Sequence, residues 1–312
     1  MIALTPNTWG KIVGMSQSSP QHFEATASDW FQGARPHTWA NAFAPVIAGS
    51  GVAAFHDGFV WWKALLALIV AWALIIGVNY ANDYSDGIRG TDEDRTGPLR
   101  LTGSGLAAPK KVKAAAFISF GIAGIAGTIL SLTSAWWLIV IGIICVLGAW
   151  FYTGGKNPYG YRGLGEIAVF VFFGLVAVLG TEFTQTGSVS WVGLAAAVGV
   201  GSMSAGVNLA NNIRDIPTDS ETGKITLAVR LGDTGARRLF LALISAPFIM
   251  SLCLAFVAWP ALIALVVLPL AVKAAQPILK HALGKALIPV IGGTGRAMAL
   301  WAVLTGLALA FS

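Results

Sequence analysis

The chain has 312 residues, of which 56% are hydrophobic and only 11% are charged, and its mean hydropathy is +0.72. Water-soluble domains carry about 25% charged residues, so this composition indicates an integral membrane protein. Only two cysteines occur, Cys145 and Cys253, and both lie inside apolar runs, which argues against a disulfide framework or a zinc site.

Nine apolar runs follow an N-terminal segment (residues 1–37) that we expect to be cytoplasmic or interfacial. A helix needs about 20 mostly apolar residues to cross the hydrocarbon core. The runs lie at residues 38–55, 61–80, 114–132, 135–152, 165–183, 190–210, 238–257, 259–276 and 293–311. The sequence therefore predicts an all-α polytopic membrane protein of nine transmembrane helices, in which residues 38–312 form a single transmembrane domain.

The basic residues predict how these helices are oriented. With the N-terminus in the cytoplasm, 19 of the 20 Lys and Arg residues fall in cytoplasmic segments, and only Lys63 falls outside. Cytoplasmic loops of membrane proteins carry an excess of Lys and Arg, so this distribution predicts a cytoplasmic N-terminus. The net charge of +6 thus follows from topology and does not require a nucleic-acid partner.

Tryptophans support the same orientation, because Trp is enriched where membrane helices meet water. Six of them stand at the predicted outer starts of the second, fourth, sixth and eighth helices: Trp61, Trp62, Trp136, Trp137, Trp191 and Trp259. An odd number of spans then puts the C-terminus outside.

The cytoplasmic ends of the second and sixth predicted helices carry the same polar pattern. NYANDYSD begins at Asn79 and NLANNIRD at Asn208, and both fit N-x-A-N-[DN]-x-x-D. A further acid follows each pattern, Asp92 and Asp219. Four spans return the chain to the same side, so we predict two parallel four-helix repeats and one added helix. The repeats cover about residues 38–152 and 165–276, and the added helix covers 293–311.

The polar residues of each pattern recur at a spacing of three to four, so they share one face of a helix. Acids at membrane depth are costly and normally face a cavity where they serve a function. Oxygen ligands without His or Cys suit Mg²⁺, which prefers one or two carboxylates together with substrate phosphate. Two facing clusters therefore suggest two Mg²⁺ ions bridged by a diphosphate. The cytoplasmic loops supply cations for the remaining oxygens: Arg89, Arg95, Arg100, Lys156, Arg162, Arg214 and Lys224.

These patterns resemble the two aspartate-rich motifs of the UbiA superfamily of intramembrane prenyltransferases. The matching residues are Asn82-Asp83-x-x-Asp86 with Asp92, and Asp215-x-x-x-Asp219. The usual first motif is NDxxDxxxD, whereas here its last acid is displaced by two residues. The resemblance covers residues 34–311 and implies a nine-helix, Mg²⁺-dependent enzyme that transfers a prenyl group from a prenyl diphosphate to an aromatic acceptor.

Further stretches resemble the branch of this superfamily that prenylates 1,4-dihydroxy-2-naphthoate in menaquinone biosynthesis. They are ARPHTW from Ala34, NYANDYSDGIRGTD from Asn79, YGYRGLGE from Tyr159 and NNIRDIPTDSETGKITLAVRLG from Asn211. The branch implies that a polyprenyl diphosphate reacts with loss of diphosphate and CO₂, giving demethylmenaquinol. The lipid tail is expected in an apolar groove among residues such as Phe170, Phe172 and Phe173.

The resemblance also implies roles for individual residues. The catalytic, metal-binding acids would be Asp83, Asp86, Asp215 and Asp219. The other metal ligands would be Asn82, Asp92, Asn208 and Asn211. The diphosphate would be bound by Arg89, Arg95, Lys156 and Lys224. Further candidates for binding the diphosphate or the acceptor are Arg35, Tyr152 and Arg162.

Other interpretations make different predictions. A related enzyme could use another aromatic acceptor, such as 4-hydroxybenzoate. A secondary transporter also combines internal repeats with intramembrane polar groups, but its site tends toward the bilayer midplane, whereas these patterns stand at helix ends beside basic loops. A lipid phosphatase or alcohol phosphotransferase is disfavoured because the sequence shows no nucleophilic His in such a motif. A single acid at a helix end or in a loop is usually just solvated by water. This interpretation suits Glu93, Asp94, Glu221 and Asp233. It does not suit eight Asn and Asp residues that are repeated in register.

Overall fold

The computed structural model describes residues 24–89 and 99–312, and this part of the chain is helical and without strands. The first half comprises α1 (Ala27–Gly33), η1 (Pro36–Thr38), α2 (Ala40–Phe55), α3 (Trp61–Arg89), α4 (Pro109–Leu132), α5 (Leu138–Phe151) and η2 (Tyr159–Arg162). The second half comprises α6 (Gly165–Val169), the π-helix η3 (Phe170–Leu179), α7 (Gly180–Thr186), α8 (Trp191–Arg214), α9 (Ile216–Glu221), α10 (Leu227–Leu254), η4 (Trp259–Val267), α11 (Leu268–Leu279), η5 (Gly284–Leu287) and α12 (Ile288–Ala310).

Seven helices in the described part of the chain are long and apolar enough to cross a membrane. They are Trp61–Arg89, Pro109–Leu132, Gly165–Thr186, Trp191–Arg214, Leu227–Leu254, Trp259–Leu279 and Gly284–Ala310. Two shorter apolar helices, α2 with 16 residues and α5 with 14, occupy the other two predicted positions. The prediction of an all-helical, multi-pass membrane protein is confirmed, while the number of nine spans and the orientation stay predictions.

Several helices extend beyond their predicted limits. Helix α3 runs to Arg89, so the whole stretch from Asn79 to Gly87 is helical, and α10 begins at Leu227. The apolar runs mark only the part of a helix that fits the hydrocarbon core, while hydrogen bonding continues into polar turns. In α10 those early turns are interrupted at Gly232, whose φ of 68° belongs to the left-handed region.

The predicted helix over 165–183 contains a π-helical segment. Helix α6, η3 and α7 run on without a break, and η3 packs along α8. A Cβ atom on Gly174 would come within 2.6 Å of the Cα of Gly201, so the backbones of η3 and α8 approach closely because both residues are glycines. Such π-helical turns are rare and occur often at functional sites.

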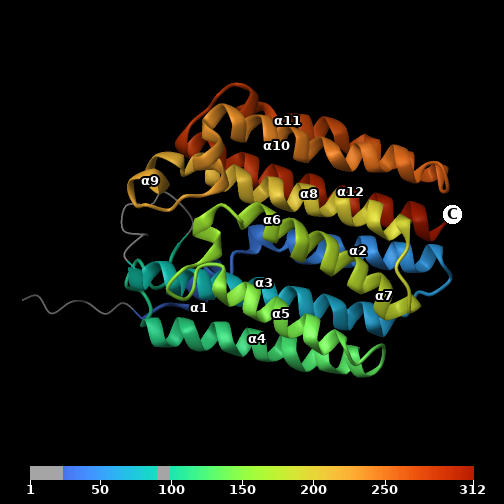
Figure 1. Ribbon diagram of the computed structural model, residues 1–312, viewed down its shortest axis with the longest axis horizontal. Helices are drawn as coiled ribbons and strands as arrows, with labels where there is room; N and C mark the ends of the chain where they lie inside the picture. Colours follow the sequence, from blue (N-terminus) through green and yellow to red (C-terminus); the bar gives the residue numbers. More distant parts are fainter. Residues whose placement is uncertain (1–23, 90–98) are drawn as a thin grey trace, which may run out of the picture.

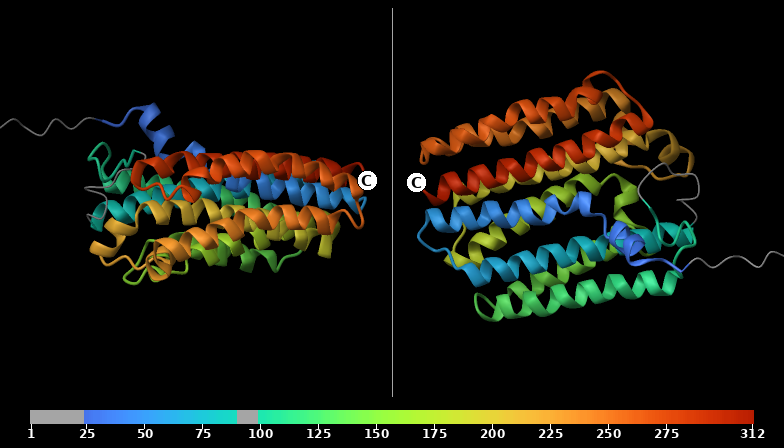
Figure 2. Two further views of the ribbon diagram at one scale, coloured as in Figure 1. Left: turned by 90° about the horizontal axis from the view of Figure 1, so that it is seen from above. Right: turned by 180° about the vertical axis from the view of Figure 1, so that it is seen from behind.

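The two polar patterns lie at the same end of the helix bundle. In Figure 1 the C-terminal ends of α3 and α8 lie at the end that carries α1 and α9, and the C-terminus lies at the opposite end. Figure 2 shows the same arrangement from above and from behind, with α12 beside α2. Helix α3 packs most extensively against α4, and α8 packs in the same way against α10. The second and third helices of each predicted repeat therefore pair alike, while the repeat itself stays a prediction.

Lys63 lies at the opposite end of the bundle, where its ammonium group donates three hydrogen bonds. Its Nζ donates hydrogen bonds to the carbonyl oxygens of Thr184 at 2.7 Å and Thr133 at 3.0 Å, and to Ser134 Oγ at 3.1 Å. The last carbonyls of a helix have no partner within the helix, and a cation is favourable there. The one predicted outer cation therefore ties the start of α3 to the ends of α4 and α7.

We expect Lys63→Met to destabilise the protein by about 2 kcal/mol, because it removes several hydrogen bonds from one charged donor. Thermal unfolding of the purified protein in detergent measures the effect. The exposed Lys280, which follows α11, provides the control variant Lys280→Met. Equal unfolding temperatures for the two variants would show that the contacts of Lys63 contribute nothing.

Candidate active site

Asp86 is the acid of the first pattern that faces polar side chains of other segments. The residue is 6% exposed, and its Oδ1 accepts a hydrogen bond from the Tyr161 hydroxyl at 2.7 Å. Arg100 places Nη2 at 3.7 Å from Asp86 Oδ2. A buried carboxylate whose oxygens face such a site can bind a further positive charge.

Two other polar residues on the same face of α3, Asp83 and Asn79, bind other segments of the protein. The fully buried Asp83 accepts hydrogen bonds from the backbone amides of Leu101 at 2.7 Å and Thr102 at 2.9 Å. Asn79 donates from Nδ2 to the carbonyl oxygen of Ala34 and to Thr38 Oγ1, both at 3.0 Å. The predicted shared face is thus present on α3. On that face, Asp83 and Asn79 hydrogen-bond to the segments that precede α4 and α2.

The loop between α5 and α6 is fastened to the end of α3. Thr153 donates from its hydroxyl to Asn82 Oδ1 at 2.8 Å, and the Arg89 guanidinium donates to the carbonyl oxygens of Thr153 and Gly155. Arg89 therefore positions the loop that carries Tyr152 and Lys156, in addition to the charge it brings to the site.

The second pattern presents its acids beside cations as well. Asp215 is 4% exposed and accepts from Arg214 Nε at 2.6 Å and Nη2 at 2.8 Å. Asp219 is 6% exposed and lies 3.2 Å from Lys224 Nζ. Asn208 accepts at Oδ1 from the Tyr152 hydroxyl at 3.2 Å, and Asn211 is half-buried on the same helix end.

Tyr161 joins the two patterns. Its hydroxyl donates to Asp86 of the first pattern, and Lys224, the partner of Asp219 in the second, lies 5.6 Å from the centre of its ring. The Arg89 guanidinium lies 5.5 Å from the same ring. The sequence signal for Tyr161 was its position in the stretch YGYRGLGE.

The other residues predicted for the site lie in the N-terminal segment, in the α5–α6 loop or outside the described residues. Arg35 adopts a left-handed conformation with φ 53° directly before η1. Partial burial lowers the pKa of His37, and the positive charges of Arg35 and Arg214 lower it further, so this segment lies near the second pattern. Lys156 and Arg162 are exposed in the α5–α6 loop. Two predicted residues, Asp92 and Arg95, lie outside the described residues.

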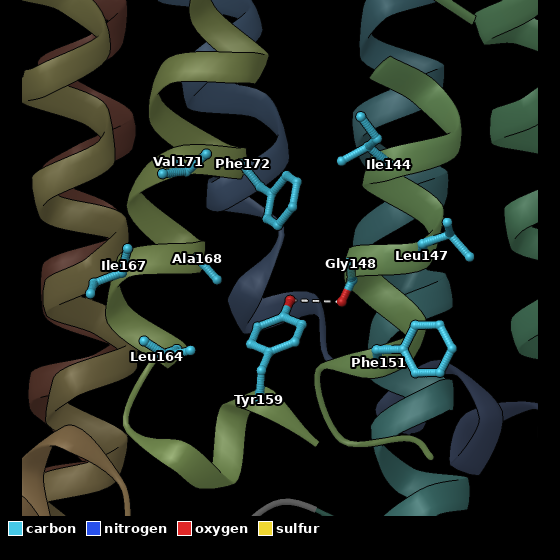
Figure 3. Close-up of a pocket in the computed structure, with 10 residues that line it drawn as sticks. All are labelled: Ile144, Leu147, Gly148, Phe151, Tyr159, Leu164, Ile167, Ala168, Val171 and Phe172. Carbon is cyan, nitrogen blue, oxygen red and sulfur yellow. Dashed lines mark hydrogen bonds between the residues drawn. The ribbon is translucent and has the colours of Figure 1, made fainter. Parts of the chain in front are cut away.

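An apolar groove of about 480 Å³ runs between α5 and the α6–η3 segment. Figure 3 shows its wall residues, with Tyr159 at one end donating a hydrogen bond to the carbonyl oxygen of Gly148 at 2.7 Å. Burial raises the pKa of Tyr159 to about 12, so its hydroxyl stays protonated. The groove is lined by Ile144, Leu147, Gly148, Phe151, Tyr159, Leu164, Ile167, Ala168, Val171 and Phe172. Of the three phenylalanines expected beside a lipid tail, Phe172 lines this groove, whereas Phe170 approaches Gly201 of α8.

The donor atoms of the site suit Mg²⁺ shared with a phosphate ligand. Within residues 24–89 and 99–312, no three His, Cys, Asp or Glu side chains come close enough to form a metal cage. The buried acids Asp86, Asp215 and Asp219 instead offer oxygen atoms at separate points, each beside an Arg or Lys. Mg²⁺ is usually held by one or two carboxylates and completes its shell with water and substrate phosphate.

Known proteins resemble this chain along most of its length. The UbiA prenyltransferase family matches residues 42–286. A protein of Mycobacterium tuberculosis named 1,4-dihydroxy-2-naphthoate octaprenyltransferase is 56% identical over 287 residues, which are 92% of this chain and 98% of the relative. A Bacillus subtilis protein of the same name is 32% identical over 238 residues, or 76% of each chain.

Solved structures share the fold at low sequence identity. A UbiA homologue from Aeropyrum pernix in its apo form has a TM-score of 0.67 at 16% identity and covers 86% of this chain and 96% of its own. A UbiA homologue from Archaeoglobus fulgidus bound to GPP and Mg²⁺ has a TM-score of 0.64 at 13% identity and covers 91% of this chain and 100% of its own.

Proposed function

Because this chain belongs to the UbiA prenyltransferase family, we propose that it transfers a polyprenyl group from a prenyl diphosphate to 1,4-dihydroxy-2-naphthoate. The transfer releases diphosphate and CO₂ and gives demethylmenaquinol, a step of menaquinone biosynthesis. The observation that carries the acceptor assignment is the 56% identity to a 1,4-dihydroxy-2-naphthoate octaprenyltransferase over nearly the whole of both chains.

Acidic and amide side chains at one end of the bundle suit Mg²⁺ and diphosphate. The ligands of two ions would come from Asp86 with Asn82, and from Asp215 and Asp219 with Asn208 and Asn211. When bound, Mg²⁺ polarises the diphosphate and stabilises the charge that develops on it as it leaves. The relative bound to GPP and Mg²⁺ supports this cofactor.

The remaining charge of the diphosphate would be met by the chain's own cations. Lys224 and Arg100 stand beside the acids of the two patterns, and Lys156 lies exposed in the adjoining loop. Arg89 would act mainly by holding that loop, and Asp83 by holding Leu101 and Thr102. Departure of the diphosphate gives an allylic cation, the naphthoate ring attacks it, and loss of the ring carboxyl as CO₂ restores aromaticity.

The apolar groove between α5 and α6–η3 would hold the prenyl tail. Its wall is apolar apart from the Tyr159 hydroxyl, and it runs beside Leu164, close to the loop of the site. A Cβ atom on Gly148 would lie 2.6 Å from Phe172 Cζ, so this glycine sets the width of the groove.

We expect Gly148→Leu to lower kcat/KM for a long polyprenyl diphosphate by about tenfold, since each buried CH₂ of a tail contributes about 0.8 kcal/mol. Steady-state kinetics with varied prenyl diphosphate measure the change. Gly142→Leu is the matched control on α5, because nothing lies within 4 Å of a Cβ there. If both variants keep wild-type kinetics, the tail does not use this groove.

Acceptor preference tests the proposed reaction. Purified protein in lipid vesicles receives a long prenyl diphosphate, Mg²⁺ and equal amounts of 1,4-dihydroxy-2-naphthoate and 4-hydroxybenzoate, and the products are separated by chromatography. Prenylated naphthoquinol is expected. Prenylated 4-hydroxybenzoate as the main product would replace the proposed acceptor, and no prenylated product at all would favour a transporter.

The protein would lie in the cell membrane, with this site on the cytoplasmic side. Most Lys and Arg of the described residues belong to segments at the end of the bundle that bears both acid patterns, and the positive-inside rule favours a cytoplasmic face there.

A further inference from the structure

Glu166, at the start of α6, is a buried carboxylate that the proposed reaction does not yet use. The residue is only 4% exposed, and its Oε1 accepts a hydrogen bond from Asn212 Nδ2 at 2.7 Å. The second oxygen, Oε2, is buried and has no hydrogen-bond partner within the described part of the chain. A buried acceptor without a donor is costly, and more so when it carries charge. Such an atom is available to a donor that a ligand would supply.

The position of Glu166 links the apolar groove with the second acid pattern. Leu164, Ile167 and Ala168 line the groove, while Glu166 meets Asn212 on α8. Asn212 directly follows Asn211 and lies one turn beyond Asn208 on the same helix. Glu166 therefore stands at the point where a prenyl tail in the groove would meet a diphosphate held by the acids.

The neighbouring side chains do not provide the missing donor. The Tyr152 hydroxyl donates its hydrogen bond to Asn208 Oδ1 at 3.2 Å. A Cβ on Gly165 would lie 3.1 Å from both the Tyr152 hydroxyl oxygen and Asn208 Nδ2, so this pair covers the residue next to Glu166. Asn208 Nδ2 likewise has no acceptor among the described residues.

We propose that Glu166 determines acceptor specificity by accepting a hydrogen bond at Oε2 from a ring hydroxyl of the aromatic acceptor. The inference rests on the proposed prenyl transfer, because the ring must approach the first carbon of the prenyl group where the groove meets the acids. A hydroxyl is the donor that a hydroxylated aromatic ring carries, and its hydrogen bond to a carboxylate is charge-assisted. The same bond pushes electron density into the ring that attacks the allylic cation.

The test compares acceptors that differ by one hydroxyl. Equilibrium affinities of the full-length protein in lipid vesicles are measured for 1,4-dihydroxy-2-naphthoate, 1-hydroxy-2-naphthoate and 4-hydroxy-2-naphthoate. In the wild type, loss of the hydroxyl that meets Glu166 should weaken binding by about 10- to 100-fold. In Glu166→Gln, which keeps the shape and the contact with Asn212, the same loss should change the affinity by less than about twofold.

The control is Glu182→Gln, a fully buried acid of the same transmembrane segment that lies in α7, near the opposite end of the bundle. It should retain the wild-type difference between acceptors. The variant Glu166→Asp keeps a carboxylate and should retain part of that difference. Thermal unfolding of each variant shows that it is folded.

Three outcomes would overturn the inference. If loss of the hydroxyl weakens acceptor binding equally in the wild type and in Glu166→Gln, Glu166 does not meet the hydroxyl. Equal weakening of all three acceptors by Glu166→Gln means that Glu166 only holds Asn212. A changed Mg²⁺ requirement with unchanged acceptor affinities means that Glu166 serves the metal site. Absence of prenyl transfer by the wild type in the same vesicles would instead contradict the proposed function.

Discussion

Replacing Asp86 by Asn should lower kcat for prenyl transfer by about 1,000-fold, the loss typical when a group that stabilises transition-state charge is removed. Asn has nearly the same shape and can still accept the hydrogen bond that Tyr161 donates at 2.7 Å. The negative charge alone disappears, and with it the means of holding Mg²⁺ beside the diphosphate. Initial rates with saturating substrates measure the loss.

The matched control is Asp57→Asn. Asp57 is exposed in the turn after α2, at the end of the bundle away from the acid patterns, and its φ of 55° suits Asn as well as Asp. This variant should keep the wild-type rate. An Asp86→Asn protein that elutes as a folded species and retains more than about a tenth of the wild-type rate would contradict the assignment of Asp86.

Removal of divalent ions should abolish transfer, with a loss of at least about 1,000-fold. Without Mg²⁺, Arg100 and Lys224 would face the diphosphate alone, while Asp86, Asp215 and Asp219 would repel it. The experiment incubates the protein with EDTA, measures the rate, and then restores Mg²⁺ in steps.

The rate should return with a dependence on Mg²⁺ that is steeper than first order, since two ions are proposed. A first-order dependence of the rate on Mg²⁺ would indicate one ion instead of two. Activity that persists in excess EDTA would refute the metal assignment altogether, because the acids would then serve only to position Arg and Lys side chains.

Much of the architecture could be predicted because the signal for a membrane helix lies within the segment that forms it. Length and hydropathy locate apolar segments without knowledge of their partners, and helical periodicity puts Asn79, Asn82, Asp83 and Asp86 on one face. The limits of the helices were less predictable. Helix α3 continues to Arg89 because backbone hydrogen bonding, rather than apolarity, decides where a helix ends.

The partners within the site could not be predicted, because they come from segments far apart in the chain. Tyr161 reaches Asp86 across 75 residues, and Glu166 meets Asn212 across 46. The pattern N-x-A-N-[DN]-x-x-D also gives no indication that Asp83 binds backbone amides while Asp86 faces other side chains. The packing of the segment before α4 and of the α5–α6 loop against the end of α3 separates these roles.

The stoichiometry of CO₂ release distinguishes the proposed reaction from a prenyl transfer that keeps the ring carboxyl. Purified protein in vesicles is given a long prenyl diphosphate, Mg²⁺ and 1,4-dihydroxy-2-naphthoate labelled in its carboxyl group, and the released CO₂ and the prenylated product are counted together. Equal amounts of labelled CO₂ and label-free demethylmenaquinol are expected from the wild type, and neither is expected from the Asp86→Asn variant. A prenylated product that keeps the label, or no product from the wild type, would contradict the proposed reaction.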